Sequence, residues 1–334
     1  MQTLNAPLKI AVVQAAPVWM DRDATLDKAC ELILEAGQSG ARLVAFPESF
    51  IPGYPDWVWS VPAGEVSVLN ELNTEFFANA LTIPSDALDK VCRIARRART
   101  HVVLGVSERS IEGIGPKLYD TLVYIDAQGR LLGRHRKLVP TGGERLVWAQ
   151  GDGSALSGFS TPLGKMGGLL GLENYMPLAR YALYTGGVQI YLAATWAHAE
   201  PWLATLRHIA KEGRVYVLSA CSVLRHVEPW ARNNVEPTID GNGEWPSAGD
   251  SAIVNPAGDF IAGPVRAKEE ILYAEIDPKQ LRGPQWMLDV AGHDARPDVF
   301  QFTINRRSSE PIMEDDGVGH IQAKEAPEDW AHGI

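Results

Sequence analysis

Apolar positions follow two spacings along the first half of the chain. Short runs rich in Val, Ile and Leu that end at Gly or Pro predict buried strands, whereas apolar residues three and four positions apart predict amphipathic helices. The pattern predicts strands over Leu8–Ala16, Arg42–Phe46 and His101–Val106, helices over Asp23–Ala36 and Asp86–Ala98, and a hairpin built from Leu118–Ile125 and Leu131–His135.

The second half repeats this order of elements without a clear sequence repeat. It predicts strands over Gly167–Leu172, Val188–Ala194, Val215–Val223 and Ile271–Ile276, helices over Pro177–Tyr184 and Trp202–Lys211, and a hairpin from Ser251–Asn255 and Phe260–Val265. Two sheets that are each covered by helices on one face bury their bare faces against one another. We therefore predict an α/β protein with a four-layer αββα sandwich.

One long uncharged stretch, Tyr181–Ala199, raises the question of a membrane span. Gly186, Gly187 and Gln189 interrupt it, so we predict a buried helix that ends at these glycines and is followed by a buried strand. The composition fits a globular chain, since 46% of the 334 residues are hydrophobic and 22% are charged. A net charge of −10 argues against nucleic acid or an anionic membrane as a partner.

The three cysteines do not form a disulfide framework or a zinc motif, and they favour a reducing, cytoplasmic compartment. Cys30 and Cys92 lie on apolar faces of predicted helices, where a packing role is expected, and Cys221 lies in a predicted strand. The eight histidines are dispersed, and the short glycine motifs lack the residues that follow in phosphate loops. We expect neither a metal nor a cofactor.

Polar residues gather where three predicted strands end. Glu48 follows the Arg42–Phe46 strand, where partial burial would raise its pKa toward that of a general base, although a lone glutamate there also fits an ordinary turn. Strand alternation puts His135 and Lys137 on one face, and a lysine in a pocket can stabilise a developing anion. The third junction, between a strand and a helix, suits a nucleophile but holds Gly171.

Together these segments resemble the nitrilase branch of the carbon–nitrogen hydrolase superfamily over roughly residues 8 to 305. The resemblance is carried by the segments VVQAAP, FPESF with PGYPDW, HRKLVPT with WAQGDGS, ENYMPLARYALY, GDSAIVNPAG and WMLDVAGHDARPDVF. It implies the αββα fold, a small nitrile-, amide- or imine-like substrate, and homodimers that extend into spirals.

The resemblance also implies site residues. The catalytic base falls on Glu48, the lysine on Lys137 and a supporting glutamate on Glu144. The nucleophilic cysteine falls on Gly171, within GLLGLEN, and no cysteine lies between Cys92 and Cys221 to replace it. Without a thiol, the family's covalent intermediate cannot form.

The family pattern has larger residues at Gly142, Gly143, Gly171 and Leu172, which indicates an enlarged pocket, whereas Glu173 matches the pattern. The pocket candidates are Gly142, Gly143, Leu172, Glu173, Trp196 and His198. Two readings stay open. In one, Glu48 and Lys137 perform non-covalent acid–base chemistry on a small carbon–nitrogen compound; in the other, the chain is an inactive or engineered nitrilase relative that retains binding and assembly. An assembly subunit without a ligand is a third, less favoured reading.

The periodic spacing of apolar residues is lost near the C-terminal end. Between Glu310 and Trp330 there are seven acidic residues and one lysine. We therefore predict a nitrilase-like domain over residues 1–305 and a flexible acidic tail over residues 306–334.

Overall fold

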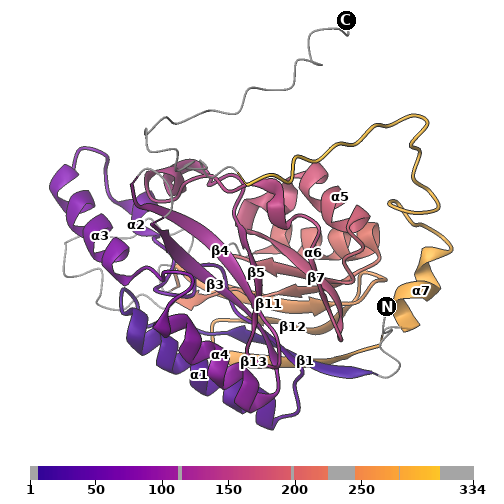
Figure 1. Ribbon diagram of the computed structural model, residues 1–334, viewed down its shortest axis with the longest axis horizontal. Helices are drawn as coiled ribbons and strands as arrows, with labels where there is room; N and C mark the ends of the chain where they lie inside the picture. Colours follow the sequence, from indigo (N-terminus) through magenta and orange to yellow (C-terminus); the bar gives the residue numbers. More distant parts are fainter. Residues whose placement is uncertain (1–6, 112–114, 197–198, 225–244, 278, 309–334) are drawn as a thin grey trace, which may run out of the picture.

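The computed structural model describes residues 7–111, 115–196, 199–224, 245–277 and 279–308, and two β-sheets lie at its centre (Figure 1). The first sheet has the strand order β13-β1-β2-β3-β4-β5, in which β1, β2 and β3 run parallel. Its strands are β1 (Leu8–Gln14), β2 (Leu43–Ala45), β3 (His101–Ser110), β4 (Lys117–Ile125), β5 (Leu131–Arg136) and β13 (Glu270–Ile276).

The second sheet has the order β10-β11-β9-β8-β7-β6, with β12 paired to β11. Strands β7, β8 and β9 are parallel, as β1, β2 and β3 are in the first sheet. Its strands are β6 (Phe159–Thr161), β7 (Gly164–Leu170), β8 (Ile190–Ala194), β9 (Tyr216–Ser219), β10 (Val223–Leu224), β11 (Ser247–Val254) and β12 (Phe260–Arg266).

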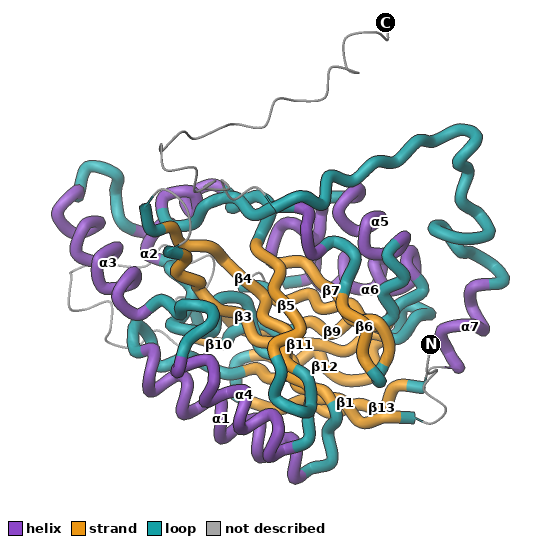
Figure 2. Tube along the Cα trace, in the orientation of Figure 1, coloured by secondary structure: helices purple, strands orange, loops and turns teal. Residues whose placement is uncertain are grey.

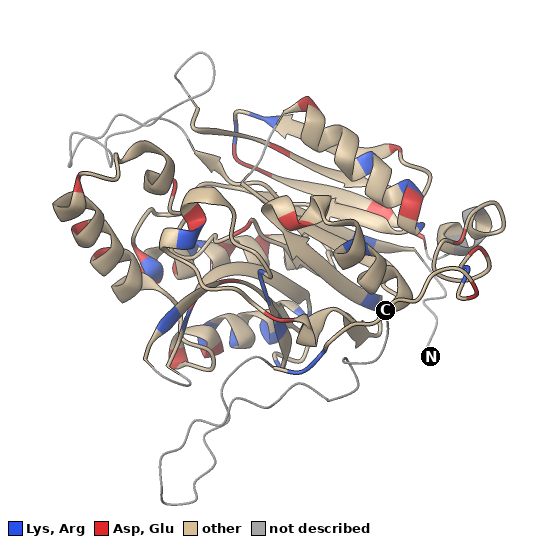
Figure 3. Cartoon of the chain, turned by 90° about the horizontal axis from the view of Figure 1, so that it is seen from above, with Lys and Arg blue, Asp and Glu red and all other residues tan. Residues whose placement is uncertain are grey.

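Helices cover the outer face of each sheet, and the two sheets pack together between them (Figure 2). Helices α1 (Arg22–Gln38) and α4 (Asp86–Ala98) lie on the first sheet, and α5 (Pro177–Thr185) and α6 (Glu200–Gly213) lie on the second. The side chains of Asp21 and Ser85 accept hydrogen bonds from the first turns of α1 and α4, as expected of N-cap residues. Charged residues of both signs are interspersed on the outer helices (Figure 3).

Alternate residues of β1 show how the layers form. Ala11 and Val13 pack with the apolar faces of α1 and α4, whereas Ile10 and Val12 face the other way. These two residues join a core that includes Leu192 of β8. Because successive side chains of a strand point to opposite faces, one apolar strand contributes to two cores. The predicted αββα sandwich is confirmed.

The last strand departs from the plan of two separate halves. β13 follows the second hairpin in the chain, yet it pairs antiparallel with β1, with Leu8 opposite Ile276. It therefore completes the first sheet rather than the second. The predicted strand Val215–Val223 is also divided, because β9 ends at Ser219 and Cys221 forms only an isolated bridge with Thr195.

Several elements were not predicted. They are the helices α2 (Trp57–Ser60), α3 (Val66–Asn79) and α7 (Lys279–Gln285), the strands β6 and β10, and the 3₁₀ helices η1 (Gly142–Leu146), η2 (Gly153–Ala155) and η3 (Gly171–Tyr175). The apolar stripe of α3 is weak, since only Leu72 and Phe76 are buried. The short elements carry too few residues to show a period.

The uncharged stretch Tyr181–Ala199 divides as predicted, into the end of α5, a turn at Gly186 and Gly187, and β8. No helix among the described residues is long and apolar enough to cross a membrane. At the C-terminal end, Phe302 packs edge-on against Tyr181 of α5. Of the flexible acidic tail predicted over residues 306–334, residues 309–334 lie outside the described residues.

Candidate active site

Glu48 lies in the loop that follows β2, pressed against β3. Gly105 of β3 permits this approach, because a Cβ atom there would lie 2.9 Å from the Cα of Glu48 and 2.8 Å from the backbone nitrogen of Ser49. The Glu48 side chain is 1% exposed. Its Oε2 accepts a hydrogen bond from the backbone N–H of Trp196 (2.8 Å), and its Oε1 lies 2.7 Å from Nζ of Lys137.

Lys137 follows β5 and is 1% exposed. Its backbone is held on both sides, since its N–H donates to Asp120 and its carbonyl accepts from Gly151. The ammonium group contacts Glu144 at 2.8 Å, in addition to Glu48. The ring of Trp148 lies 5.6 Å from Nζ, within the range of a cation–π contact.

Glu144 lies in η1 and is held by several donors. It accepts hydrogen bonds from the backbone N–H of Thr141 (2.7 Å) and from the hydroxyl of Tyr54 (2.7 Å), besides its contact with Lys137. Trp59 in turn donates from Nε1 to the Tyr54 hydroxyl at 3.2 Å. The structure thus brings Glu48, Lys137 and Glu144 together.

Asp120 of β4 is a member of this cluster that the sequence analysis missed. It is fully buried, and its Oδ2 lies 3.5 Å from Nζ of Lys137. Neither of its oxygens accepts a hydrogen bond. The available signal was a single acidic residue within the apolar Leu118–Ile125 run.

Burial and mutual repulsion set the electrostatics of this cluster. Burial raises the pKa of Glu48, with Lys137 opposing that rise. The pKa of Asp120 is raised well above its usual range by burial and then by the charge of Glu48. Burial by itself lowers the pKa of Lys137, but the surrounding carboxylates outweigh burial and raise it, so the lysine is an ammonium ion at neutral pH.

Gly171 begins η3 directly opposite these side chains. Its φ of +46° lies in the left-handed region, which glycine adopts without the strain that other residues incur. A Cβ atom built on Gly171 would lie 2.8 Å from Oε1 of Glu48 and 3.2 Å from Nζ of Lys137. The Glu48 and Lys137 side chains therefore converge on this residue, at the strand–helix junction expected from the sequence.

Two of the pocket candidates next to Gly171 lie elsewhere. The carboxylate of Glu173 is buried and accepts from the backbone N–H groups of Leu138 (2.6 Å) and Leu170 (2.9 Å), and it lies 3.2 Å from Nε2 of His135. Glu173 thus ties β7 to the end of β5 instead of lining a pocket. Leu172 is 45% exposed. His135 and Lys137 both face this region, as strand alternation predicted.

The glycines at 142 and 143 leave no extra space, contrary to the expected enlargement. A Cβ atom on Gly142 would lie 2.7 Å from the ring of Trp59, and one on Gly143 would lie 2.8 Å from the carbonyl oxygen of Val58. Helix α2 fills the volume that larger side chains would take. Trp196 stacks on Tyr54 with ring centroids 4.8 Å apart, and His198 lies outside the described residues.

All three cysteines are free. Cys30 packs in the core beneath α1, and burial raises its pKa to about 11. Cys221 is fully buried, and burial, together with the charges of Asp250 and Glu48, raises its pKa well above the usual range. A thiol with a raised pKa is a poor nucleophile because the thiolate is the reactive form.

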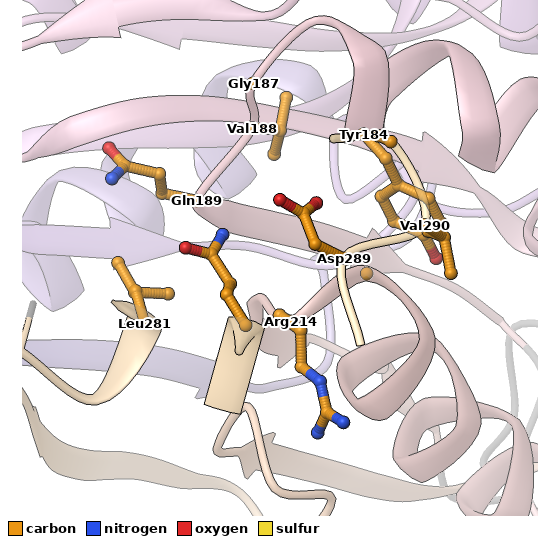
Figure 4. A pocket seen from close by; sticks show the side chains of 11 residues that line it. Tyr184, Gly187, Val188, Gln189, Arg214, Leu281, Asp289 and Val290 are labelled. Carbon is orange, nitrogen blue, oxygen red and sulfur yellow. The ribbon is translucent and has the colours of Figure 1, made fainter. Parts of the chain in front are cut away.

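A small pocket of about 170 Å³ lies elsewhere, between the α5–β8 turn and the segment around α7 (Figure 4). Its lining includes Tyr184, Arg214 and Asp289 but no residue of the Lys137 cluster and not Gly171. Arg214 is engaged by backbone carbonyls, donating to Leu288 and Pro256. Among the described residues, no cluster of three or more His, Cys, Asp and Glu side chains could hold a metal ion.

A family comparison decides the relationship of this chain to known proteins. Residues 9–283 match the model of the carbon–nitrogen hydrolases. The chain belongs to the carbon–nitrogen hydrolase family. It is 39% identical over 308 residues to an aliphatic nitrilase of Sinorhizobium fredii, covering 91% of this chain and 98% of that protein. It is 37% identical over 320 residues to a bifunctional nitrilase/nitrile hydratase of Lupinus angustifolius, covering 92% and 89%.

Solved structures share the fold at low sequence identity. Nit3 of Saccharomyces cerevisiae, a member of the nitrilase superfamily, superimposes with a TM-score of 0.68 at 20% identity, covering 87% of this chain and 98% of that one. An amidase from Nesterenkonia sp. gives a TM-score of 0.61 at 19% identity, covering 86% and 97%. This carbon–nitrogen hydrolase therefore has the αββα sandwich of its relatives.

Proposed function

We propose that this carbon–nitrogen hydrolase adds water to a small nitrile-, amide- or imine-like compound without forming a covalent intermediate. The observation that carries the proposal is the buried contact of Lys137 with Glu48 and Glu144, which faces a glycine. A buried lysine and its carboxylates are costly to desolvate, and a role in chemistry explains their presence.

Each residue has a defined part in this chemistry. Glu48 is the general base, because burial raises its pKa while Lys137 and the Trp196 N–H orient its oxygens. Lys137 is the electrophilic group that stabilises developing negative charge. Glu144 is a positioning residue that fixes the ammonium group.

For a nitrile substrate the step balances as a hydration. Glu48 takes one proton from water, and the water oxygen bonds to the nitrile carbon while one C–N π bond breaks. Lys137 stabilises the charge on nitrogen, and Glu48 returns the proton to that nitrogen. The resulting imidic acid rearranges to the amide. The name of the lupin relative, a bifunctional nitrilase/nitrile hydratase, supports hydration as a reaction class for this scaffold.

The missing thiol separates this chemistry from covalent hydrolysis. A mutant of the Nesterenkonia amidase shows the result of Michael addition of acrylamide at its active-site cysteine, whereas our proposed nucleophile position here is Gly171. Removing the nucleophile from a coupled catalytic set costs on the order of a million-fold in rate. We therefore expect negligible ordinary nitrilase turnover.

The test is a screen of small nitriles, amides and imines, with products identified by mass spectrometry. We expect amide release from a nitrile, and a loss of about 10²- to 10⁴-fold in Glu48→Gln, which keeps the shape but removes the base. Glu275→Gln, on the exposed face of β13, is the matched control and should retain full activity. Turnover that Glu48→Gln leaves untouched would defeat the proposal.

A second candidate is a relative that binds ligand without turnover. The observation that favours it is the close approach of Glu48 to Gly171, since Oε1 lies only 2.8 Å from the position that a Cβ atom on residue 171 would take. Substrate-like nitriles that raise the melting temperature without being consumed by the wild-type protein would select this candidate.

We also propose a cytoplasmic homo-oligomer. The free cysteines support a reducing compartment. Leu172, Tyr175 and Leu178 are exposed at 45%, 44% and 68% on η3 and the start of α5, which supports a contact surface there. Light scattering on the purified protein should give a mass of at least two chains, and Leu178→Lys should reduce it. A monomeric mass at micromolar concentration would contradict this.

A further inference from the structure

Three carboxylates surround one ammonium group in the candidate active site. Glu48, Asp120 and Glu144 are 1%, 0% and 5% exposed, and each has an oxygen within 3.5 Å of Nζ of Lys137. Fully ionised, the cluster would carry two uncompensated negative charges away from water. Like charges that share a buried site do not all ionise, so the cluster must hold at least one extra proton.

The hydrogen bonds show which carboxyl group holds that proton. Glu48 accepts from Lys137 and from the N–H of Trp196. Glu144 accepts from Lys137, Thr141 and Tyr54. These donors stabilise the ionised forms of both glutamates. Asp120 accepts no hydrogen bond, and its contact with Lys137 at 3.5 Å is longer than a hydrogen bond between charged groups.

We propose that Asp120 carries a proton at neutral pH and donates it in a hydrogen bond to Glu48. Asp120 and Glu48 together then carry one negative charge. With the positive charge of Lys137 and the negative charge of Glu144, the cluster has a net charge of −1. Asp120 acts as a positioning residue that keeps Glu48 ionised and oriented. The inference depends on the cluster's geometry and does not require the proposed function.

Three charged groups among the described residues face Asp120: the two glutamates favour its protonated form, and Lys137 favours its ionised form. Glu48 approaches from the loop after β2, Lys137 from the end of β5 and Glu144 from η1. On β3, Ser107 is opposite Asp120, and its hydroxyl is engaged by Ser49 and Trp148. The nearby arginines point elsewhere, because Arg134 and Arg136 pair with Glu108. The raised pKa of Asp120, caused first by burial and then by Glu48, has the same direction.

The sign of the pH effect follows from proton linkage. An aspartate whose pKa is raised in the folded state binds more protons folded than unfolded at any pH between its unfolded value, about 3.9, and its folded value. Stability contributed by this group is therefore lost as the pH rises through that window. Asparagine keeps the donor to Glu48 and does not titrate.

The experiment compares the melting temperatures of wild type and Asp120→Asn from pH 5 to pH 8. As the pH rises, we expect the melting temperature of the variant to increase relative to that of wild type by about 2 °C per pH unit, up to the pKa of Asp120 in the folded protein. Asp126→Asn is the matched control in the same hairpin. The carboxylate of Asp126 accepts hydrogen bonds from Arg130 and Gln128, and these outweigh burial and lower its pKa. The change of melting temperature with pH caused by Asp126→Asn therefore has the opposite sign and occurs mostly below pH 5. A melting temperature of Asp120→Asn that falls relative to that of wild type as the pH rises would overturn the proposal.

A second measurement needs no substitution at residue 120. Among the described residues, Asp56 is a second buried aspartate whose pKa is raised well above its usual range, in this case by burial. Infrared spectra of Asp56→Asn protein carrying ¹³C-labelled aspartate should show a carboxylic acid C=O band at pH 7 that shifts with the label. Absence of a label-sensitive acid band would mean that Asp120 is ionised. Neither measurement requires substrate turnover, so failure here is distinguishable from failure of the proposed function.

Discussion

A Cβ atom on Gly171 would lie 2.8 Å from Oε1 of Glu48, closer than side chains normally approach. Glu48 is not free to withdraw, because Lys137 and the N–H of Trp196 hold both of its oxygens. The identity of residue 171 therefore affects the position of Glu48, the proposed base. This makes substitution at 171 the most informative change in the protein.

A thiol placed at residue 171 tests whether the proposed site is competent. Gly171→Cys should gain nitrile hydrolysis, whereas Gly171→Ala, which adds the same Cβ atom without sulfur, should not. Both variants should lose about 1–2 kcal/mol of unfolding free energy, because φ at this residue is +46°. Chemical denaturation and ammonia release measure the two effects. Equal inactivity of both variants would rule out a simple loss of the thiol.

Lys137 should be essential for the stability of the sandwich. Lys137→Met leaves Glu48, Asp120 and Glu144 without their shared cation, and breaking a buried ion pair in this way costs about 3–5 kcal/mol. Urea denaturation measures the loss. Lys268→Met, which removes an exposed pair with Glu270, should change stability by no more than about 1 kcal/mol. Similar small losses in both variants would show that the buried cluster is not held as described.

Gly142 should be intolerant of a side chain. Gly142→Ala places a methyl group 2.7 Å from the Trp59 ring at a φ of +53°. We expect a loss of about 1–2 kcal/mol and disruption of the Trp59–Tyr54 hydrogen bond. Gly64 has no neighbour within 4 Å of its Cβ position, so Gly64→Ala is the control and should be nearly neutral. A stable Gly142→Ala protein would indicate that α2 does not press against η1.

The cysteines should react slowly in the folded protein. Burial raises the pKa of Cys30, Cys92 and Cys221 and so depresses the thiolate fraction of each. A colorimetric thiol reagent at pH 8 should label Cys92 first, since it is half-buried. Cys30 and Cys221 should be labelled only after denaturation. Rapid labelling of Cys221 in the native protein would contradict its buried position.

Strong periodic patterns allowed most of the fold to be predicted from the sequence. The bounds of α4 agree with the prediction at both ends, and the hairpin of β4 and β5 agrees within one residue. Helix α2 was missed because its four residues are too few to show a period, and α3 was missed because only Leu72 and Phe76 are buried. The pairing of β13 with β1 was also missed, since strand partners distant in sequence leave no local signal.

For the candidate site, the order of residues supplies the available side chains: Glu48, Lys137 and Glu144, and a glycine at the strand–helix junction. Which of these groups meet depends on how the folded chain packs. This packing brought Asp120 into the cluster, turned Glu173 toward the backbone of Leu138 and Leu170, and filled the space beside Gly142 and Gly143 with α2. Proximity between distant segments arises from packing two sheets together, and a linear pattern of apolar and polar residues does not encode those distances.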